Sequence, residues 1–269
     1  MTTTHKTLGY FSAAYDSPES YDVTTRYAIL ASPRTGSDYL CARLANFQDA
    51  LGMPMEYLHP DAVAEISARA PRPPDVVPGT EGNVAVGDYM EILESIRSTA
   101  DGYFGLKAQP AQLLALAGGK LEQMAAFLRE FDKLVFLYRR DKVAQAVSGA
   151  IAQMTGRWVN FGEEIELTGQ QRTVLFPLIA ERLAGYLKED ALVDAVAEAL
   201  ADHPSLVIEH ESLIEAPDDA IQEVVSFLKF GQDVLPPEQD LVPVTARPAG
   251  DAAAQIRADF LAYIANAQG

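Results

Sequence analysis

The stretch Tyr27-Ala-Ile-Leu-Ala-Ser-Pro-Arg-Thr-Gly-Ser-Asp-Tyr-Leu-Cys-Ala-Arg-Leu44 decides the fold. Its first five residues form a short apolar run that is typical of a fully buried strand. A compact turn follows at residues 32–37, and Leu40, Leu44 and Phe47 then recur at helical spacing. The stretch therefore predicts a strand, a tight turn and the start of a helix, in that order.

The turn at residues 32–37 has the composition of an anion-binding site. Backbone N–H groups of such a turn converge with the N-terminus of the following helix, where the helix dipole favours negative charge. Gly36 lets the backbone approach a ligand closely, and Thr35 and Ser37 add hydroxyl donors beside Arg34. The alternative is an ordinary strand-to-helix connection in which Arg34 points into solvent.

This turn differs from the phosphate loop of nucleoside triphosphatases. That loop has the pattern G-x-x-x-x-G-K-[ST], with a lysine after the second glycine and a hydroxyl that holds magnesium. Here Ser37 follows Gly36, and the cation, Arg34, precedes the glycine.

The composition narrows the class of protein. The 269 residues are 48% hydrophobic and 22% charged, which is ordinary for a soluble globular protein. A net charge of −17 and an isoelectric point near 4.5 argue against non-specific nucleic-acid binding, so a few focused cations must capture any anion. Cys41 is the only cysteine, which excludes an internal disulfide and favours a reducing compartment. The polar residues 1–6 and the shortness of every apolar run predict a cytoplasmic protein without a transmembrane segment.

Apolar runs alternate with amphipathic stretches along the rest of the chain. After the first strand, strands are expected at residues 103–108, 133–138 and 206–209. A single helix is expected over residues 111–131, and a mostly helical segment that breaks near Gly169 and Gly185 over residues 163–201. This alternation predicts an α/β fold: a mostly parallel sheet with helices on both faces.

The chain shows no internal repeat and no strong linker, which predicts one large domain. Residues 1–26 are polar with scattered aromatic side chains and are predicted to form an N-terminal arm on the surface. Residues 27–269 would then form a single α/β domain.

A second informative stretch, Arg139-Arg140-Asp-Lys-Val-Ala-Gln-Ala-Val-Ser148, follows the expected strand at residues 133–138. Ligands of parallel sheets bind at the carboxyl ends of the strands, where Lys107 and the turn at residues 32–37 also emerge. An arginine offers a planar fork of donors that suits a phosphate monoester, and Ser148 would complete the site from the next helix. Alternatively, both arginines pair with Asp141 and with surface carboxylates.

Together these stretches resemble the bacterial sulfotransferases that use 3′-phosphoadenosine-5′-phosphosulfate (PAPS), especially the trehalose 2-sulfotransferase family. The resemblance covers the chain from about Tyr27 to Phe230, and its pieces follow one another in the family's order. The pieces are Ala31-Ser-Pro-Arg-Thr-Gly-Ser37, which looks like the S-x-R-[ST]-G-S loop; Pro54-Met-Glu-Tyr57, like the P-x-E-[FY] segment; Phe104-Gly-Leu-Lys107, like the F-G-x-K strand; and Leu206-Val-Ile-Glu-His-Glu-Ser-Leu213 before a helix ending Phe227-Leu228, like the late strand–helix unit of sulfotransferases. The resemblance implies a P-loop-like sulfotransferase fold.

The resemblance also implies which residues hold the donor PAPS. Its 5′-phosphosulfate would be held by Ser32, Pro33, Arg34, Thr35, Gly36 and Ser37. Its 3′-phosphate would be held by Arg139 and Ser148, with Arg140 as the alternative to Arg139.

For the reaction itself, the resemblance implies that Glu56 is the general base that accepts the proton of the acceptor hydroxyl. His59 is the rival base. Arg34 would neutralise the charge that grows on the leaving 5′-phosphate. Lys107 would contact the sulfuryl group or the acceptor, because a buried lysine needs an anionic partner.

Three residues leave alternatives open. Trp158, the only tryptophan, either stacks on a sugar or on adenine, or packs in the protein. Arg247 is a candidate for closing over the site. Asp38 stands where relatives usually carry threonine, so it either favours the helix dipole or repels the donor if it points inward.

The sequence therefore predicts a PAPS-dependent sulfotransferase that needs no metal and acts on a hydroxyl of a carbohydrate, glycolipid or similar small acceptor. Members of the family form dimers, which makes a homodimer the expected assembly if this chain associates. One alternative is a kinase or hydrolase with a divergent phosphate loop, against which the missing lysine counts. The other is a non-catalytic relative that binds a nucleotide or a sugar.

Overall fold

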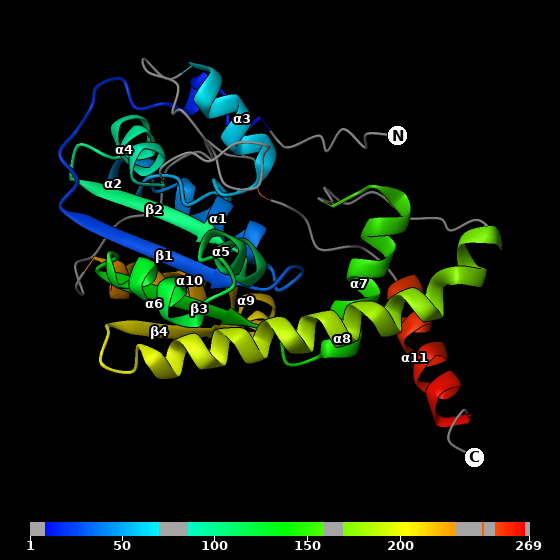
Figure 1. Cartoon of the computed structure of the whole chain (residues 1–269). Coiled ribbons are helices and arrows are strands. Elements are labelled where there is room, and N and C mark those ends of the chain that lie inside the picture. The colour runs from blue at the N-terminus through cyan, green and yellow to red at the C-terminus, as the bar shows by residue number, and fades with distance from the viewer. Residues whose placement is uncertain (1–8, 70–85, 159–168, 230–243, 245–250, 267–269) are drawn as a thin grey trace.

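The computed structural model describes residues 9–69, 86–158, 169–229, 244 and 251–266 (Figure 1). The strands are β1 (Thr25–Ala31), β2 (Tyr103–Ala108), β3 (Lys133–Tyr138) and β4 (Ser205–Glu209). The helices are η1 (Ala13–Tyr15), α1 (Ser37–Ala45), α2 (Gln48–Leu51), α3 (Pro60–Arg69), α4 (Val86–Arg97), α5 (Pro110–Leu116), α6 (Leu121–Arg129), α7 (Lys142–Thr155), α8 (Gly169–Ala199), α9 (His210–Glu215), α10 (Pro217–Leu228) and α11 (Asp251–Asn266).

The four strands form one parallel sheet in the order β2-β1-β3-β4. β1 is central, with Ile29 opposite Lys107 of β2 on one side and opposite Val135 of β3 on the other. Nearly all of β1 is buried, as expected for an apolar strand in a sheet that is covered on both faces. The predicted α/β fold with a parallel sheet is confirmed, and the carboxyl ends of the strands meet at one edge.

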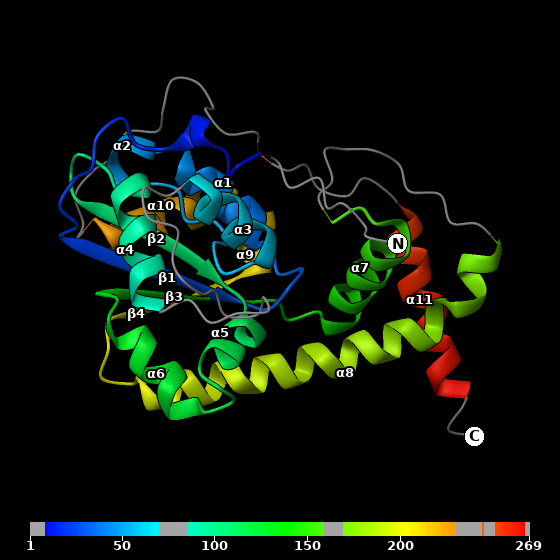
Figure 2. The ribbon, with the colours of Figure 1, turned by 45° about the horizontal axis from the view of Figure 1, so that its top comes forward.

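Helices cover both faces of this sheet (Figure 2). α1, α2 and α10 lie on one face, and α5, α6 and the C-terminal half of α8 lie on the other. α7 and α11 lie beyond the carboxyl ends of the strands and pack with the N-terminal half of α8 (Figure 1). A small second core, with Val147, Ile179 and Phe260 among its members, joins these three helices. The middle of α8 therefore passes the edge of the sheet where the strands end.

The contact between β1 and β2 explains the glycine in Phe104-Gly-Leu-Lys107. The ring of Tyr27 lies against Gly105 so closely that a Cβ there would clash with it. Beyond Gly105, the Tyr27 hydroxyl donates to the carbonyl of Leu51 at 2.9 Å. The glycine thus allows one tyrosine to tie the central strand to the end of α2.

Some expectations about the helices were wrong. The helix predicted over residues 111–131 is two helices, α5 and α6, because Gly118 (φ +59°) and Gly119 (φ +79°) adopt left-handed conformations that end α5. The break expected near Gly185 is absent, since α8 runs through it.

The N-terminal arm at residues 1–26 is also more than a surface segment, because Phe11 is only 5% exposed and joins the main core.

Candidate active site

The turn between β1 and α1 contains two left-handed residues. Arg34 has a φ of +68° and is the only non-glycine residue with a positive φ in the described part of the chain, and Gly36 has a φ of +87°. This conformation costs a side-chain-bearing residue about 1–2 kcal/mol and persists where the surroundings fix it, often at functional sites. A Cβ on Gly36 would lie 2.8 Å from Nδ1 of His210, so the position needs glycine for space as well.

Two hydrogen bonds stabilise the peptide units of this turn. The Thr35 hydroxyl donates to the carbonyl of Ser32 at 2.9 Å. Nδ1–H of His210, at the start of α9, donates to the carbonyl of Thr35 at 2.9 Å, which fixes the proton on that nitrogen. Sequence analysis did not single out His210, although it directly follows β4 at the edge where the other site residues emerge.

Arg34, Ser148 and Arg139 come together although they lie far apart in the sequence. Nε of Arg34 donates to the Ser148 hydroxyl at 3.0 Å, and another of its N–H groups donates to the carbonyl of Trp158. The Arg139 guanidinium donates to the carbonyl of Arg34 at 3.1 Å. Burial lowers the pKa of Arg139; the carboxylates of Asp141 and Glu211 oppose this shift, and the positive charge of Arg34 adds to it. Two like charges held together in this way favour an anion between them.

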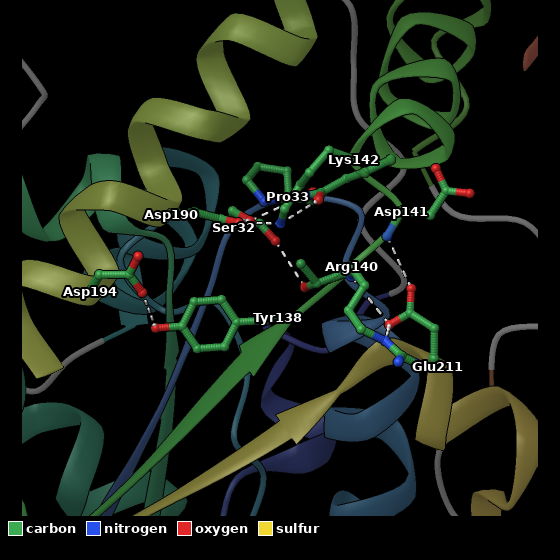
Figure 3. A network of polar contacts seen from close by, with 11 residues as sticks. Ser32, Pro33, Tyr138, Arg140, Asp141, Lys142, Asp190, Asp194 and Glu211 are labelled. Carbon is green, nitrogen blue, oxygen red and sulfur yellow. Dashed lines mark hydrogen bonds and ion pairs between the residues drawn. The ribbon is translucent and has the colours of Figure 1, made fainter. Parts of the chain in front are cut away.

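Arg140 points away from the turn. Its Nε lies 3.1 Å from Glu209 Oε2 and 3.7 Å from Glu211 Oε2, and its side chain is 62% exposed (Figure 3). Arg139 therefore contacts the turn, whereas Arg140 pairs with the carboxylates of Glu209 and Glu211. Trp158 contributes a backbone carbonyl to Arg34, and Arg247 lies outside the described residues.

Polar side chains from α7 and α8 hold the beginning of the turn (Figure 3). The Ser32 hydroxyl donates to Asp190 Oδ1 at 3.0 Å and accepts from the Gln145 amide at 3.0 Å. The same amide donates to the Pro33 carbonyl at 2.7 Å, and Lys142 pairs with Asp190. The Ser32 side chain is therefore engaged within the protein. Neither Gln145 nor Asp190 was predicted from the sequence as a site residue.

On the other side of the turn, Lys107 bridges two carboxylates. Its Nζ lies 2.6 Å from Asp38 Oδ1 and 2.7 Å from Glu56 Oε2, and its side chain is 5% exposed. Burial alone would lower the pKa of Lys107, but the two carboxylates outweigh it and raise that pKa. Burial alone would raise the pKa of Asp38, but the charge and hydrogen bond of Lys107 outweigh it and lower that pKa. At neutral pH the cation and this anion are both present, and Asp38 is paired.

Glu56 reaches Lys107 because its segment runs beside β2. Met55 forms a parallel bridge with Leu106, and the Lys107 N–H donates to the Met55 carbonyl at 3.0 Å. Glu56 Oε1 accepts from the Gln109 amide at 2.8 Å and from the Gln112 amide at 2.7 Å. With Lys107, three of about four lone-pair positions of the carboxylate are used, which leaves one for a ligand.

The two amides that orient Glu56 were also missed. Gln109 is the N-cap residue of α5, two residues after Lys107, and Gln112 lies three residues further on, so the two amides share one side of the helix start. That spacing was a usable signal. The rival base His59 adjoins this group through its backbone, since its N–H donates to the Glu56 carbonyl at 3.0 Å, while its Nδ1 accepts from the Asp61 N–H at 3.3 Å.

Two further findings concern metals and membranes. Within residues that the structure describes, no group of three or more His, Cys, Asp or Glu side chains is arranged to hold a metal ion. No helix in the same part of the chain is both long and apolar enough to cross a bilayer. Cys41 is buried, and burial raises the pKa of its thiol.

The chain is similar to known proteins. A sequence model of the family described as Stf0 sulphotransferase matches residues 26–255. A search among curated proteins found no match. Solved structures similar to the chain include a sulfotransferase from Alicyclobacillus acidocaldarius, with 17% identity, 89% of this chain and 92% of that chain covered, and a TM-score of 0.46. The sulfotransferase domain from the curacin biosynthetic pathway has 17% identity, with 87% of this chain and 83% of that chain covered and a TM-score of 0.48.

Proposed function

The chain belongs to the Stf0 sulphotransferase family, and from this premise we propose that it moves a sulfuryl group from PAPS to a hydroxyl of a carbohydrate, glycolipid or similar small acceptor. The supporting observation is that one turn has cations for a phosphate on one side and a carboxylate base on the other. Arg34 contacts Ser148 and Arg139 contacts the Arg34 carbonyl, while Lys107 contacts Glu56.

The first side of the turn suits the 3′-phosphate of PAPS. Nε of Arg139 is buried and has no hydrogen-bond partner among the described residues. A buried donor without a partner is costly, and two adjacent guanidinium groups are costly as well. A phosphate monoester between Arg139, Arg34 and the Ser148 hydroxyl would relieve both costs.

The turn itself suits the 5′-phosphosulfate. The N-terminus of α1 begins at Ser37, and the helix dipole favours an anion there. Gly36 has no side chain to obstruct a ligand, and Arg34 adds positive charge beside it. PAPS would supply the activated sulfuryl group, and the turn would stabilise charge on the phosphate that departs.

The second side suits the acceptor hydroxyl. Glu56 is oriented by Gln109 and Gln112, and its remaining lone-pair position can take the hydroxyl proton as the new bond to sulfur forms. Lys107 holds a positive charge next to that carboxylate, where sulfuryl oxygens need it. In such transfers catalysis is mostly alignment and charge stabilisation. The hydrogen-bonding character of this side supports a hydroxyl-rich acceptor.

The remaining parts of the proposal concern the whole protein. We propose a cytoplasmic location, which a single buried cysteine supports. We also propose one domain over residues 27–269 with an arm at residues 1–26, and a homodimer. Light scattering of the purified protein tests the dimer directly.

Calorimetry and a transfer assay together test the function. The wild-type protein is titrated with PAP, the desulfated donor, and separately with ATP and magnesium, and is then incubated with PAPS and a panel of sugars and glycolipids. We expect PAP binding, no ATP binding and sulfation of at least one hydroxyl. PAP binding without transfer across a broad panel would indicate the non-catalytic relative, and ATP binding in its place would indicate a kinase or hydrolase.

A further inference from the structure

Glu189, in the middle of α8, carries a buried carboxylate oxygen. Its Oε2 has no hydrogen-bond partner among the residues that the structure describes. Leaving a buried polar atom unpaired costs about 1–3 kcal/mol, so such atoms are rare and call for an explanation. A ligand that completes the hydrogen bond is one such explanation.

The neighbours of Glu189 on α8 touch both parts of the proposed donor site. Asp190 accepts from the Ser32 hydroxyl at 3.0 Å, at the beginning of the turn. Tyr186, three residues before Glu189, presses its hydroxyl so closely on Gly149 that a Cβ there would clash with it, and Gly149 follows Ser148. The Tyr186 hydroxyl is also buried and has no hydrogen-bond partner in the described part of the chain. Residues three or four apart share a helix face, so Glu189 belongs to the face that borders the donor site.

The charges around Glu189 favour its neutral form. Burial and then the carboxylate of Asp190 raise the pKa of Glu189 to about 7; Glu56 adds to this, and Arg182 opposes it. Lys142 of α7 is paired with Asp190. A protonated carboxyl has one O–H donor, whereas an ionised one only accepts.

We propose that Glu189 acts in its protonated form and donates a hydrogen bond to the 5′-phosphate end of the bound nucleotide. This inference rests on the proposed function, because it requires PAP or PAPS at the turn. The ionised carboxylate would repel the phosphate and leave its own oxygen unsatisfied. Nucleotide binding therefore takes up a proton at Glu189 when the free protein is ionised there.

Proton uptake measured by calorimetry tests this contact. PAP is titrated into wild type and Glu189→Gln at pH 6 and pH 8, in pairs of buffers with different ionisation enthalpies. At pH 8, wild type should take up more protons than the variant when PAP binds. Between pH 6 and pH 8, the PAP affinity of wild type should fall about tenfold more than that of the variant, because the fraction of Glu189 that is neutral falls. Glutamine keeps the shape and a donor, so the variant should bind well at both.

Three controls identify the contact. Adenosine 3′-phosphate lacks the 5′-phosphate and should show no uptake that depends on Glu189. Glu198→Gln, on the exposed face of the same helix, should behave as wild type. Any protons that His210 or the nucleotide takes up or releases on binding are the same in wild type and in the variants, so they cancel when proton uptake is compared between these proteins.

The outcomes separate this inference from the proposed function. Equal proton uptake by wild type and Glu189→Gln would overturn the inference while PAP binding stands. Failure of both proteins to bind PAP would overturn the proposed function. If the variant does not fold, difference infrared spectroscopy of wild type with PAP gives the answer, since a new protonated-carboxyl band must appear at pH 8 and its absence would overturn the inference.

Discussion

The ammonium group of Lys107 lies 2.7 Å from the carboxylate of Glu56, and the same ammonium lies 2.6 Å from Asp38. One buried cation thus ties the end of β2 to the start of α1 and to the segment that follows α2. Asp38, which the sequence left open as a group that repels an anionic donor, is neutralised by this contact. The acceptor side of the turn is therefore organised before any ligand arrives.

Replacing Lys107 with methionine should destabilise the protein strongly. Two carboxylates would remain close together without their cation, and losing one partner of a buried ion pair costs about 3–5 kcal/mol. The cost should fall near the lower end because the Asp38 side chain is 45% exposed. Urea unfolding measures it, with the exposed Lys188→Met on α8 as the control. A Lys107→Met protein as stable as the control would show that the pair contributes nothing.

Glu56→Gln should keep the fold and lose the reaction. Glutamine still accepts from Lys107 but cannot take up a proton, and removing a general base lowers turnover by about 10²–10⁴-fold. PAP affinity should stay within about twofold, because Glu56 makes none of the proposed contacts to the nucleotide. Steady-state sulfation and calorimetry test this, with Glu122→Gln and His59→Asn as matched controls. Full turnover in Glu56→Gln, or its loss in His59→Asn, would reassign the base.

Alanine substitution should weaken PAP binding strongly at Arg139 and hardly at all at the adjacent Arg140. Arg139→Ala removes a buried guanidinium next to Arg34, and a charge-assisted hydrogen bond is worth about 1.5–3 kcal/mol, which is about 10–100-fold in affinity. Arg140→Ala removes only contacts to Glu209 and Glu211 at the surface, so the affinity should change less than about twofold. The reverse order of effects would assign the 3′-phosphate to Arg140.

Local sequence patterns were sufficient to predict the strands that consist of apolar runs. β2 and β3 lie at the predicted residues, and β1 differs only at its start, because a central parallel strand is apolar on both faces and shows as an unbroken run. The errors arose at glycines. Gly118 and Gly119 ended a helix through their positive φ, whereas Gly185 remained inside α8, where a glycine costs only about 1 kcal/mol. Composition alone does not distinguish these two uses of glycine.

Some residues of the candidate site could likewise be predicted from local sequence patterns, and others could not. The turn, Glu56 and Lys107 lie in short motifs that are recognisable because they occur together and in order. Asp190 meets Ser32 across 158 positions of sequence, on a helix that carries several other acidic residues. No local signal marks which carboxylate faces the turn, since that depends on how α8 crosses the edge of the sheet.

Glu189 should make the stability of the protein depend on pH in a direction opposite to that of an ion-paired carboxyl. Its pKa in the folded state, about 7, lies above the ordinary unfolded value of about 4.3. The folded state then binds more protons between these values, so stability is greatest below the unfolded pKa and falls as pH rises toward 7. Glu189→Gln should not lose stability through this titration as the pH rises, so its Tm should be higher than that of wild type at pH 8. Thermal unfolding at pH 5 and pH 8, with Glu198→Gln beside it, tests this; equal Tm changes in all three proteins would contradict it.

Gly36→Ala tests whether space or backbone conformation dictates the glycine of the turn. The φ of +87° alone should cost alanine about 1–2 kcal/mol. In addition, the new Cβ would lie 2.8 Å from Nδ1 of His210, so the imidazole must move and weaken its hydrogen bond to Thr35. The two contributions separate in a double-mutant cycle with His210→Ala, because only the clash disappears when the imidazole is absent. We expect Gly36→Ala to cost more stability with His210 present than without it, as measured by urea unfolding. If the cost were the same in both backgrounds, the backbone conformation alone would account for the glycine, and α9 would set no limit on the shape of the turn.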